Sequence, residues 1–357
     1  MKKHMVLAGV LAGVFGLVMT ADATNFEKYL SISETPFSDT ELGTDHKSFA
    51  FLDYDGDGDL DAFVGRNKRI DYFRNDGTAA APDFVKVTGT ENPFDGVSFS
   101  DLVRIAAADI VEDTENYKDI VVCEFDGNEF KVYEYKDDPS PSLTDAGVLS
   151  FPGFNMGSHT IITPAFYDVN KDGIDDALIG LDNGTTKYYR GTASFSGGIR
   201  EFQTPATDPF NGKTVVSSDE LAAPALADIN GDELDDFVVG GQTNIVYFLG
   251  QESGGFGDRV LASGFSGNYQ APVFIDIDND SQLELFVGQA GANFSNSGYW
   301  AIKYIPELSH VIDGLKFMAG ITVEQANLDA IDVVVTDPKI IDLADIISSL
   351  RIISESQ

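Results

Sequence analysis

The strongest chemical pattern in the sequence is the run DYDGDGDLDAFVG, which begins at Asp53. Asp55, Asp57 and Asp61 follow at positions three, five and nine of this loop, and Gly58 at position six permits a tight turn. Carboxylates this close together repel one another unless a cation lies among them, and Ca²⁺ takes about six to eight oxygen ligands. The pattern therefore predicts a calcium-binding loop, with a solvated acidic turn as the alternative.

The loop recurs along the chain, so its spacing matters as much as its composition. The candidate side-chain ligands of three further copies are Asp168, Asn170, Asp172 and Asp176; Asp228, Asn230, Asp232 and Asp236; and Asp276, Asp278, Asp280 and Glu284. A fifth copy, from Asp109 to Asp119, is longer and has Val111 where a ligand is expected, so we predict no metal there. Successive ninth positions lie 48 to 60 residues apart.

The segments that flank these loops are predicted to be short strands. Apolar runs of four to five residues flank each loop, and Gly, Asn, Asp and Pro bound them. An aromatic-rich third strand and a fourth strand follow in each repeat, and we expect the aromatic rings to pack between sheets. Phe26–Phe37 resembles Phe84–Phe94, which ends the first repeat. These features predict an all-β fold, a five-bladed β-propeller whose N-terminal strand closes the last blade, plus a small C-terminal α-helical segment.

The loops and their flanks resemble the FG-GAP/VCBS repeat family, which includes the calcium-loop propeller of the integrin α-subunit head. The run from Asn75 to Ala79, followed by Phe84, is similar to secreted bacterial members. The resemblance implies about four calcium ions, each held by side chains at positions one, three, five and nine and by a backbone carbonyl at position seven. The residues that would supply this carbonyl are Asp59, Ile174, Leu234 and Gln282. Glu233 and Ser281 replace the loop glycine in two copies.

Charge excludes some partners. The chain has 58 acidic and 23 basic residues, for a net charge of -35, which repels nucleic acid and anionic membranes and attracts divalent cations. Cys123 is the only cysteine, so no disulfide can form within the chain.

The two ends differ from the repeats. Residues 1–23 resemble a secretory signal peptide, with Lys2 and Lys3, an apolar run too short for a membrane span, and a small-x-small site ending at Ala23. We therefore expect a bacterial protein that is secreted, at the cell surface or periplasmic, with the propeller in residues 24–306. Residues 307–357 contain two amphipathic segments that resemble a dockerin-like helical pair, either docking to a surface partner through 308–357 or capping the propeller.

Residues that could form a catalytic centre are scattered. The four histidines are His4, His46, His159 and His310, and no glycine-rich phosphate loop is present. The sequence thus favours a recognition or adhesion module for an extracellular protein or polysaccharide. One alternative is a glycosidase or lyase, which needs two carboxyl groups facing each other. Another is a lectin with one sugar pocket per blade.

Overall fold

The structure is a computed structural model that describes residues 26–28, 37, 42, 46–113, 117–124, 129–137, 141–155, 157, 159, 161–215, 221–230, 232–262, 265, 268–279, 283–290 and 299–302. These residues belong to one compact unit, Phe26–Tyr304. The predicted signal peptide (1–23) and the predicted helical pair (307–357) lie outside the described residues.

The unit is all-β in the part of the chain that the structure describes, apart from short turns such as the 3-10 turn η2 (Gly89–Glu91). Its strands form five four-stranded antiparallel sheets, which we number in chain order. Sheet 1 contains β2 (Ser48–Leu52), β3 (Asp61–Arg66), β4 (Arg69–Asn75) and β5 (Phe84–Val87). Sheet 2 contains β6 (Val103–Ala108), β7 (Asp119–Glu124), β8 (Phe130–Lys136) and β9 (Ser142–Leu149). Sheet 3 contains β10 (Ile162–Tyr167), β11 (Asp176–Leu181), β12 (Thr186–Ser196) and β13 (Ile199–Gln203).

Sheet 4 contains β14 (Ala223–Ala227), β15 (Asp236–Gly240), β16 (Ile245–Gly250) and β17 (Phe256–Leu261). Sheet 5 contains β18 (Asn268–Ile275), β19 (Glu284–Ala290), β20 (Tyr299–Ile302) and β1 (Phe26–Lys28). The prediction of four strands per repeat is confirmed. The N-terminal strand completes the last sheet as predicted, because β1 pairs with β20 in the register Phe26↔Ile302.

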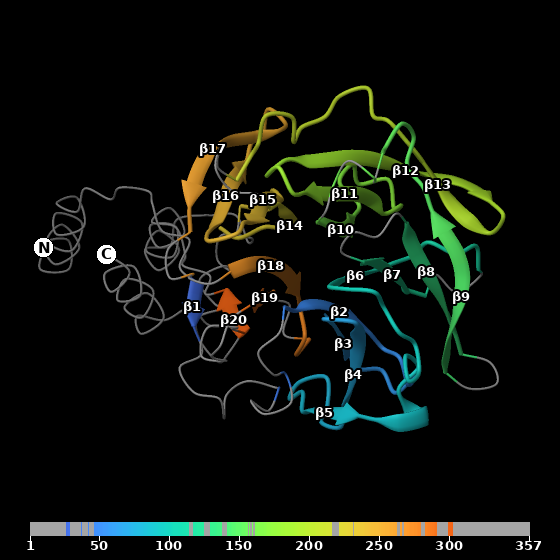
Figure 1. Cartoon of the computed structure of the whole chain (residues 1–357). Helices are drawn as coiled ribbons and strands as arrows, with labels where there is room; N and C mark the ends of the chain where they lie inside the picture. Colours follow the sequence, from blue (N-terminus) through green and yellow to red (C-terminus); the bar gives the residue numbers. More distant parts are fainter. Residues whose placement is uncertain are drawn as a thin grey trace, which may run out of the picture. The chain divides into compact units, whose positions relative to one another are not determined.

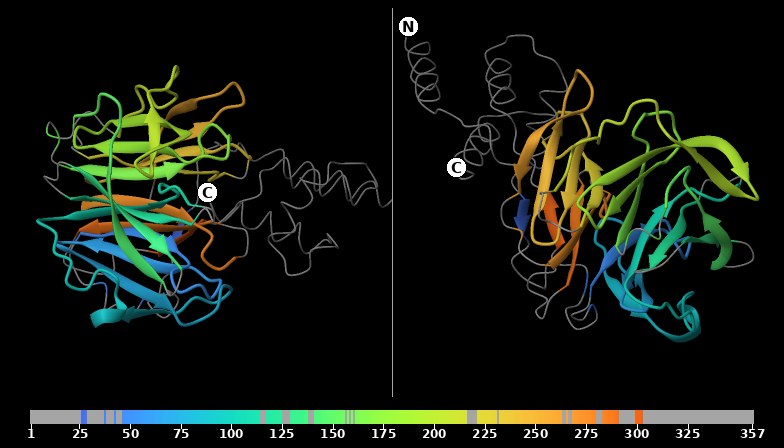
Figure 2. Two further views of the ribbon diagram at one scale, coloured as in Figure 1. Left: turned by 90° about the vertical axis from the view of Figure 1, so that its right-hand side faces the viewer. Right: turned by 45° about the horizontal axis from the view of Figure 1, so that its top comes forward.

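The sheets have a propeller arrangement. The first strands β2, β6, β10, β14 and β18 contact one another in succession, and β18 and β19 contact β2, so the last sheet meets the first. In Figure 1 these first strands lie nearest the centre, and β5, β9, β13 and β17 lie at the periphery. Figure 2 shows the same succession of sheets from two other directions. The connections between first and second strands, where the acidic loops lie, are therefore held by rigid sheets.

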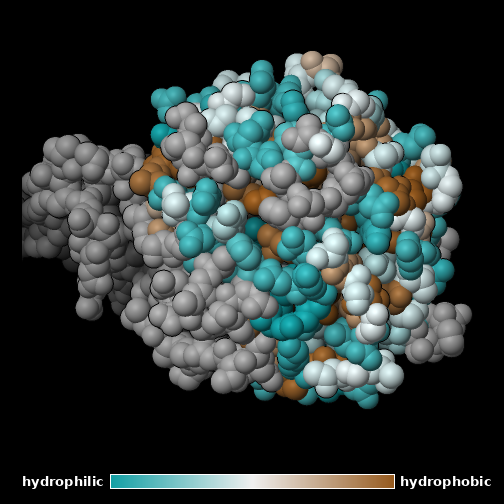
Figure 3. All heavy atoms as spheres, in the orientation of Figure 1, coloured by the Kyte–Doolittle hydropathy of each residue, from teal (hydrophilic) through white to brown (hydrophobic). Residues whose placement is uncertain are grey.

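The hydrophobic core is divided among the junctions between sheets. Five clusters of buried side chains each combine residues of two adjacent sheets, and the one that joins sheets 5 and 1 includes Phe49, Phe73 and Phe286. Ring centroids of Phe51 and Phe286 lie 4.7 Å apart across this junction. The prediction that aromatic side chains pack between sheets is confirmed. Burial of such large rings supplies much of the stabilisation of the fold. On the face seen in Figure 3, hydrophobic side chains show through only in small separate patches among the described residues.

Glycines at the ends of second strands permit the close approach of neighbouring sheets. A Cβ at Gly180 would lie 2.1 Å from the backbone oxygen of Ala222, and one at Gly288 would lie 2.2 Å from that of Lys47. Gly65 and Gly240 face the next sheet in the same way. In the other four sheets a glycine stands at this position of the second strand and pairs with a small residue, whereas in sheet 2 Cys123 stands there and pairs with Arg104.

Candidate metal centre

The loop between β2 and β3 gathers three carboxylates. Carboxylate oxygens of Asp53, Asp55 and Asp57 all lie within 4.8 Å of one another. Burial raises the pKa of Asp55, and the neighbouring negative charge of Asp57 raises it further. The donor set consists of oxygen atoms alone, which is the chemistry that a hard divalent cation such as Ca²⁺ prefers. The first, third and fifth predicted positions are thus brought together and fit this cation.

The loop is wound around its first residue. The Asp53 carboxylate accepts hydrogen bonds from the backbone N–H groups of Gly56 (2.8 Å) and Gly58 (3.0 Å). Gly58 has φ of 97°, a left-handed conformation that glycine adopts at low cost. The sequence therefore specifies this curl locally, through an aspartate at position one and a residue at position six that tolerates positive φ.

The same winding recurs in sheets 3 and 4. Asp168 accepts hydrogen bonds from the N–H groups of Asp172 (2.9 Å) and Gly173 (2.7 Å). Asp228 likewise accepts a bond from the N–H of Glu233 (2.7 Å), which takes the glycine position with φ of 67°. The exchange of glycine for glutamate therefore leaves the backbone path of this loop unchanged, at a cost in strain.

The ninth position has a role in the fold that the sequence did not reveal, and Asp61 is not among the three carboxylates gathered in its loop. Asp61 is buried, and its Oδ1 accepts a bond from Asn75 N (2.7 Å) on the third strand. Its Oδ2 accepts bonds from Tyr54 N (3.2 Å) in the loop and from the Tyr72 hydroxyl (2.9 Å). Burial raises the pKa of Asp61 to about 6, although these bonds act in the opposite direction. Asp61 therefore ties the acidic loop to the sheet.

Equivalent bonds hold the other ninth positions. Asp176 accepts a bond from Gly191 N (2.8 Å), Asp236 accepts bonds from Ile229 N (2.9 Å) and Gly250 N (2.7 Å), and Glu284 accepts one from Ile277 N (3.0 Å). Burial raises the pKa of Asp236 to about 7. Of these residues, Glu284 also gathers with Asp276 and Asp278, with oxygens within 4.8 Å of one another. Asp280 and Gln282, the remaining predicted ligands of this loop, lie outside the described residues.

The degenerate copy in sheet 2 keeps its ninth position. Asp119 is fully buried and accepts bonds from Val111 N (2.8 Å), Ile110 N (3.0 Å) and Tyr135 N (3.1 Å). Burial raises its pKa to about 6. Because the ninth-position carboxylate makes these hydrogen bonds even where the metal pattern is lost, the bonds stabilise the fold independently of any ion.

Two arginines take positions near loop carboxylates. Arg200, on β13 of the neighbouring sheet, contacts Asp109 through Nη2 and Oδ2 (2.8 Å) and donates from Nε to the Asp109 carbonyl (2.9 Å). A fixed cation from another sheet thus faces the first position of the degenerate copy, where the sequence predicts no metal. Arg190 contacts Asp172 at position five of the sheet 3 loop (2.6 Å) and lowers the pKa of Asp172. No feature of the repeat pattern indicated either arginine.

Position seven is described in three loops. Asp59, Ile174 and Leu234 each follow the glycine-type position, and the Asp59 side chain is buried with no hydrogen-bond partner at Oδ1. Burial raises the pKa of Asp59 to about 6, with a contribution from Asp57. The Asp59 carboxylate interacts with that of Asp57 but is not among the three carboxylates that lie within 4.8 Å of one another.

The histidines are separate from these loops. His159 Nδ1 lies 2.7 Å from the Asp182 carboxylate, and His46 lies near Tyr269. His4 and His310 lie outside the described residues. Within the described part of the chain, no helix is long and apolar enough to cross a membrane.

Comparison with known proteins agrees with this architecture. Residues 228–287, which include the sheet 4 loop and continue into β19, match the model of the FG-GAP-like repeat. With the propeller arrangement, this match supports the resemblance to FG-GAP propellers. No curated protein matches the chain.

Three solved structures share part of the backbone arrangement. RS223-β-xylosidase is 14% identical with a TM-score of 0.49, over 80% of this chain and 97% of that chain. The Photorhabdus luminescens Tc holotoxin pore is 17% identical with a TM-score of 0.32, over 71% of this chain and 11% of that chain. The V. cholerae biofilm matrix protein Bap1 is 16% identical with a TM-score of 0.27, over 70% and 45%. Nothing about the function of this chain follows from similarities at this level.

Proposed function

We propose that the chain is an exported, calcium-stabilised propeller of five blades that acts as a recognition or adhesion module outside the cell. The observation that carries the proposal is the gathering of Asp53, Asp55 and Asp57 in a loop whose backbone is fixed by both flanking strands. The FG-GAP-like match over residues 228–287 supports the same reading.

Calcium in these loops would be structural. Asp53, Asp55 and Asp57 would hold an ion in sheet 1, with the Asp59 carbonyl at position seven, and equivalent residues would hold one in sheets 3, 4 and 5. A bound ion neutralises the repulsion among these carboxylates and so stabilises the folded state by mass action. The ninth-position carboxylate has a separate role, because its hydrogen bonds to the loop and to the third strand do not involve an ion.

Export and partners form the second half of the proposal. The segment 1–23 would direct export, and the mature protein would be secreted or attached to the cell surface. A rigid ring presents loops of different sequence on one face, which suits binding of an extracellular protein or polysaccharide. Residues 308–357 would dock to a surface partner.

A melting scan of the chain from residue 24, with calcium and with a chelator, tests the metal half of the proposal. Extracellular sites have dissociation constants of about 10⁻⁴–10⁻³ M. Calcium at about 10 mM should therefore add about 1–3 kcal/mol per occupied site.

We expect the chelator to lower the melting midpoint, and Asp55→Asn to reduce the calcium-dependent part of the midpoint. Asp258→Asn, a change at an exposed position of strand β17, is the control and should leave this calcium-dependent part intact. An unchanged midpoint in chelator would reject structural calcium.

Capture from the cell surface tests the other half. The mature protein, used as bait with calcium and with chelator, should retain a surface protein or polysaccharide only in calcium. Equal retention in both conditions, or none in either, would contradict a calcium-stabilised recognition module.

A further inference from the structure

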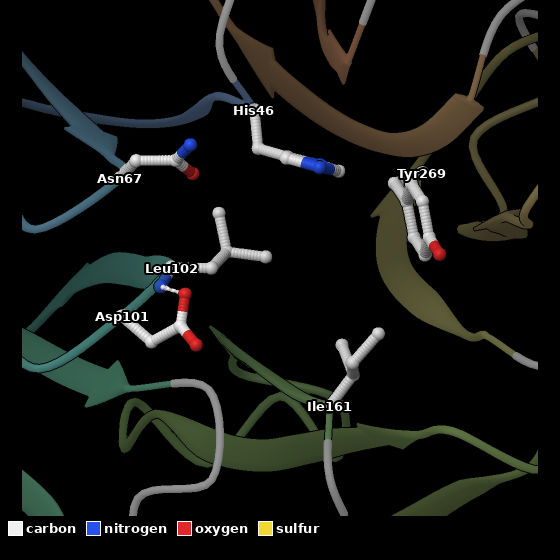
Figure 4. A pocket seen from close by; sticks show the side chains of 6 residues that line it. All are labelled: His46, Asn67, Asp101, Leu102, Ile161 and Tyr269. Carbon is white, nitrogen blue, oxygen red and sulfur yellow. Dashed lines mark hydrogen bonds between the residues drawn. The ribbon is translucent and has the colours of Figure 1, made fainter.

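A pocket of about 210 Å³ opens at the centre of the sheets, away from the acidic loops. Four of the five sheets contribute to its wall, at or near the starts of their first strands. The lining residues are His46, Asn67, Asp101, Leu102, Ile161 and Tyr269. Figure 4 shows their side chains gathered around a common space, with the rings of His46 and Tyr269 on one side and the Leu102 and Ile161 side chains below them. None of these residues belongs to the repeat motif, so the pocket is a feature of the ring as a whole.

The wall of the pocket is held by hydrogen bonds between sheets. The buried Arg104 side chain donates from Nη1 to the Lys47 carbonyl (2.9 Å) and from Nη2 to the Tyr269 carbonyl (3.4 Å). These bonds fix the backbone next to His46 and at Tyr269. Lys68 N donates to the Asp101 carbonyl (2.9 Å), and the Asp101 carboxylate accepts a bond from Leu102 N (2.8 Å). The backbone around the space and the Asp101 carboxylate are thus held by hydrogen bonds, and a preformed site lowers the entropic cost of binding.

Tyr269 is held in an unusual conformation. Its φ is 59°, in the left-handed region that residues with a side chain rarely adopt. Its N–H donates to the Gln242 carbonyl (2.9 Å), which keeps it there. Its ring lies 4.8 Å from the His46 ring at an angle of 65°. Backbone strain that places an aromatic ring at the wall of a pocket is an observation from which a binding role can be inferred.

We infer that this pocket binds a single neutral sugar ring, an inference that rests on the proposed recognition function and names its ligand class. The C–H faces of a sugar match the aromatic and aliphatic surfaces of Tyr269, Leu102 and Ile161. The hydroxyl groups match the amide of Asn67 and the carboxylate of Asp101. The volume equals that of about seven water molecules at about 30 Å³ each, enough for one ring but not for a longer chain inside the pocket. The net charge of -35 and the carboxylate at the wall disfavour an anionic sugar.

Binding fits the lining better than hydrolysis does. Most glycoside hydrolases use two carboxyl groups about 5–9.5 Å apart across the sugar. Among the lining residues Asp101 alone carries a carboxyl group, and one of its oxygens accepts the Leu102 N–H. The pocket therefore has groups that orient hydroxyls but lacks, among its lining residues, the pair that would break a glycosidic bond.

Saturation-transfer difference NMR on the mature chain in calcium tests the inference. The probes are the methyl glycosides of glucose, galactose, mannose, xylose and N-acetylglucosamine, with glucuronate as the charged comparison. At least one neutral glycoside should receive saturation, and Asn67→Ala and Tyr269→Gly should each reduce its affinity at least about fivefold. Tyr269→Gly removes the ring while relieving the positive φ, so it should not destabilise the fold. Asp258→Asn, at an exposed position of strand β17 that does not line the pocket, is the control and should leave the affinity unchanged.

Each outcome decides the inference. Absence of binding for all neutral glycosides, binding of glucuronate alone, or equal affinity in the Asn67→Ala variant would overturn it. Melting in calcium and chelator, measured on the same samples, separates this failure from failure of the proposed function. If calcium stabilises the chain and a surface partner is captured while no glycoside binds, the recognition module stands and the sugar pocket falls.

Discussion

At the scale of single residues, the ninth-position carboxylates have a role that the metal pattern conceals. Asp61 and Asp119 make similar bonds to a loop and to a third strand, although only Asp61 lies in a loop with the metal pattern. A buried carboxylate that accepts hydrogen bonds from several backbone N–H groups replaces the backbone hydrogen bonds that are lost where two strands diverge. Its position at the start of every second strand follows from this geometric task.

We expect Asp119→Asn to destabilise the fold by about 2–4 kcal/mol, because an amide can replace only one of the two accepting oxygens and leaves buried N–H groups facing another donor. Denaturant unfolding measures the change. The loss should be the same in calcium and in chelator, whereas a loss seen only in calcium would indicate a metal ligand. Asp258→Asn again serves as the exposed control.

Asp71 in sheet 1 makes a pH-dependent contribution to the stability of the fold. Burial would raise its pKa, but hydrogen bonds from Lys86 and Arg66, both 2.8 Å from Oδ2, outweigh burial and lower the pKa. A group whose folded pKa lies below its unfolded value of about 3.9 stabilises the fold above that pH and loses this contribution as the pH falls through the folded pKa.

Asp71→Asn should therefore cost about 3 kcal/mol at pH 7, because it leaves two buried or half-buried cations without their carboxylate. Unfolding measured from pH 7 to pH 2 should show the difference from the unmodified chain shrink below about pH 4. Asp76→Asn, at an exposed pair with Arg74, is the comparison and should change little at any pH. A pH-independent difference for Asp71→Asn would contradict the assignment.

At the scale of elements, the end of each second strand sets how closely adjacent sheets approach. Gly65, Gly180, Gly240 and Gly288 place bare backbone against the next sheet. Sheet 2 instead has Cys123 opposite Arg104, whose long side chain reaches carbonyls of sheets 1 and 5. One irregular strand pair thus connects three sheets at the centre.

Gly288→Ala should destabilise the fold by about 2–4 kcal/mol, because a Cβ would lie 2.2 Å from the Lys47 oxygen at the junction of the last and first sheets. Thermal unfolding gives the value. Gly257→Ala provides the matched control, since its Cβ would meet nothing closer than 3.4 Å and its φ is not positive. Equal stability of the two variants would show that the junction is looser than described.

At the scale of the whole molecule, two features close the circle of sheets: the pairing of the N-terminal strand and the packing of the last sheet on the first. β1 pairs with β20, and the cluster containing Phe49, Phe73 and Phe286 joins the last sheet to the first. Closure covers the sheet faces that an open row would expose and pairs the outer edge of β20.

Removal of β1 should weaken this closure. A chain that begins at residue 30 should unfold at a lower temperature than one that begins at residue 24, with a loss of the order of 2 kcal/mol from the missing backbone bonds. Faster proteolysis should accompany the loss, because β20 would expose an unpaired edge. Identical midpoints for the two chains would mean that closure depends on side-chain packing alone.

The acidic loops, the four strands of each repeat and the strand that returns to the last sheet could all be predicted from the order of the residues. These features depend on neighbours within about ten residues, such as Asp53 with Gly58, or on a motif repeated along the chain, so they can be read locally. Three features became visible only in the folded molecule: Arg200 faces Asp109, Arg104 spans three sheets, and His46, Asp101 and Tyr269 share one pocket. Their positions depend on the angle and spacing at which separate sheets pack, and no periodicity in the chain encodes those contacts.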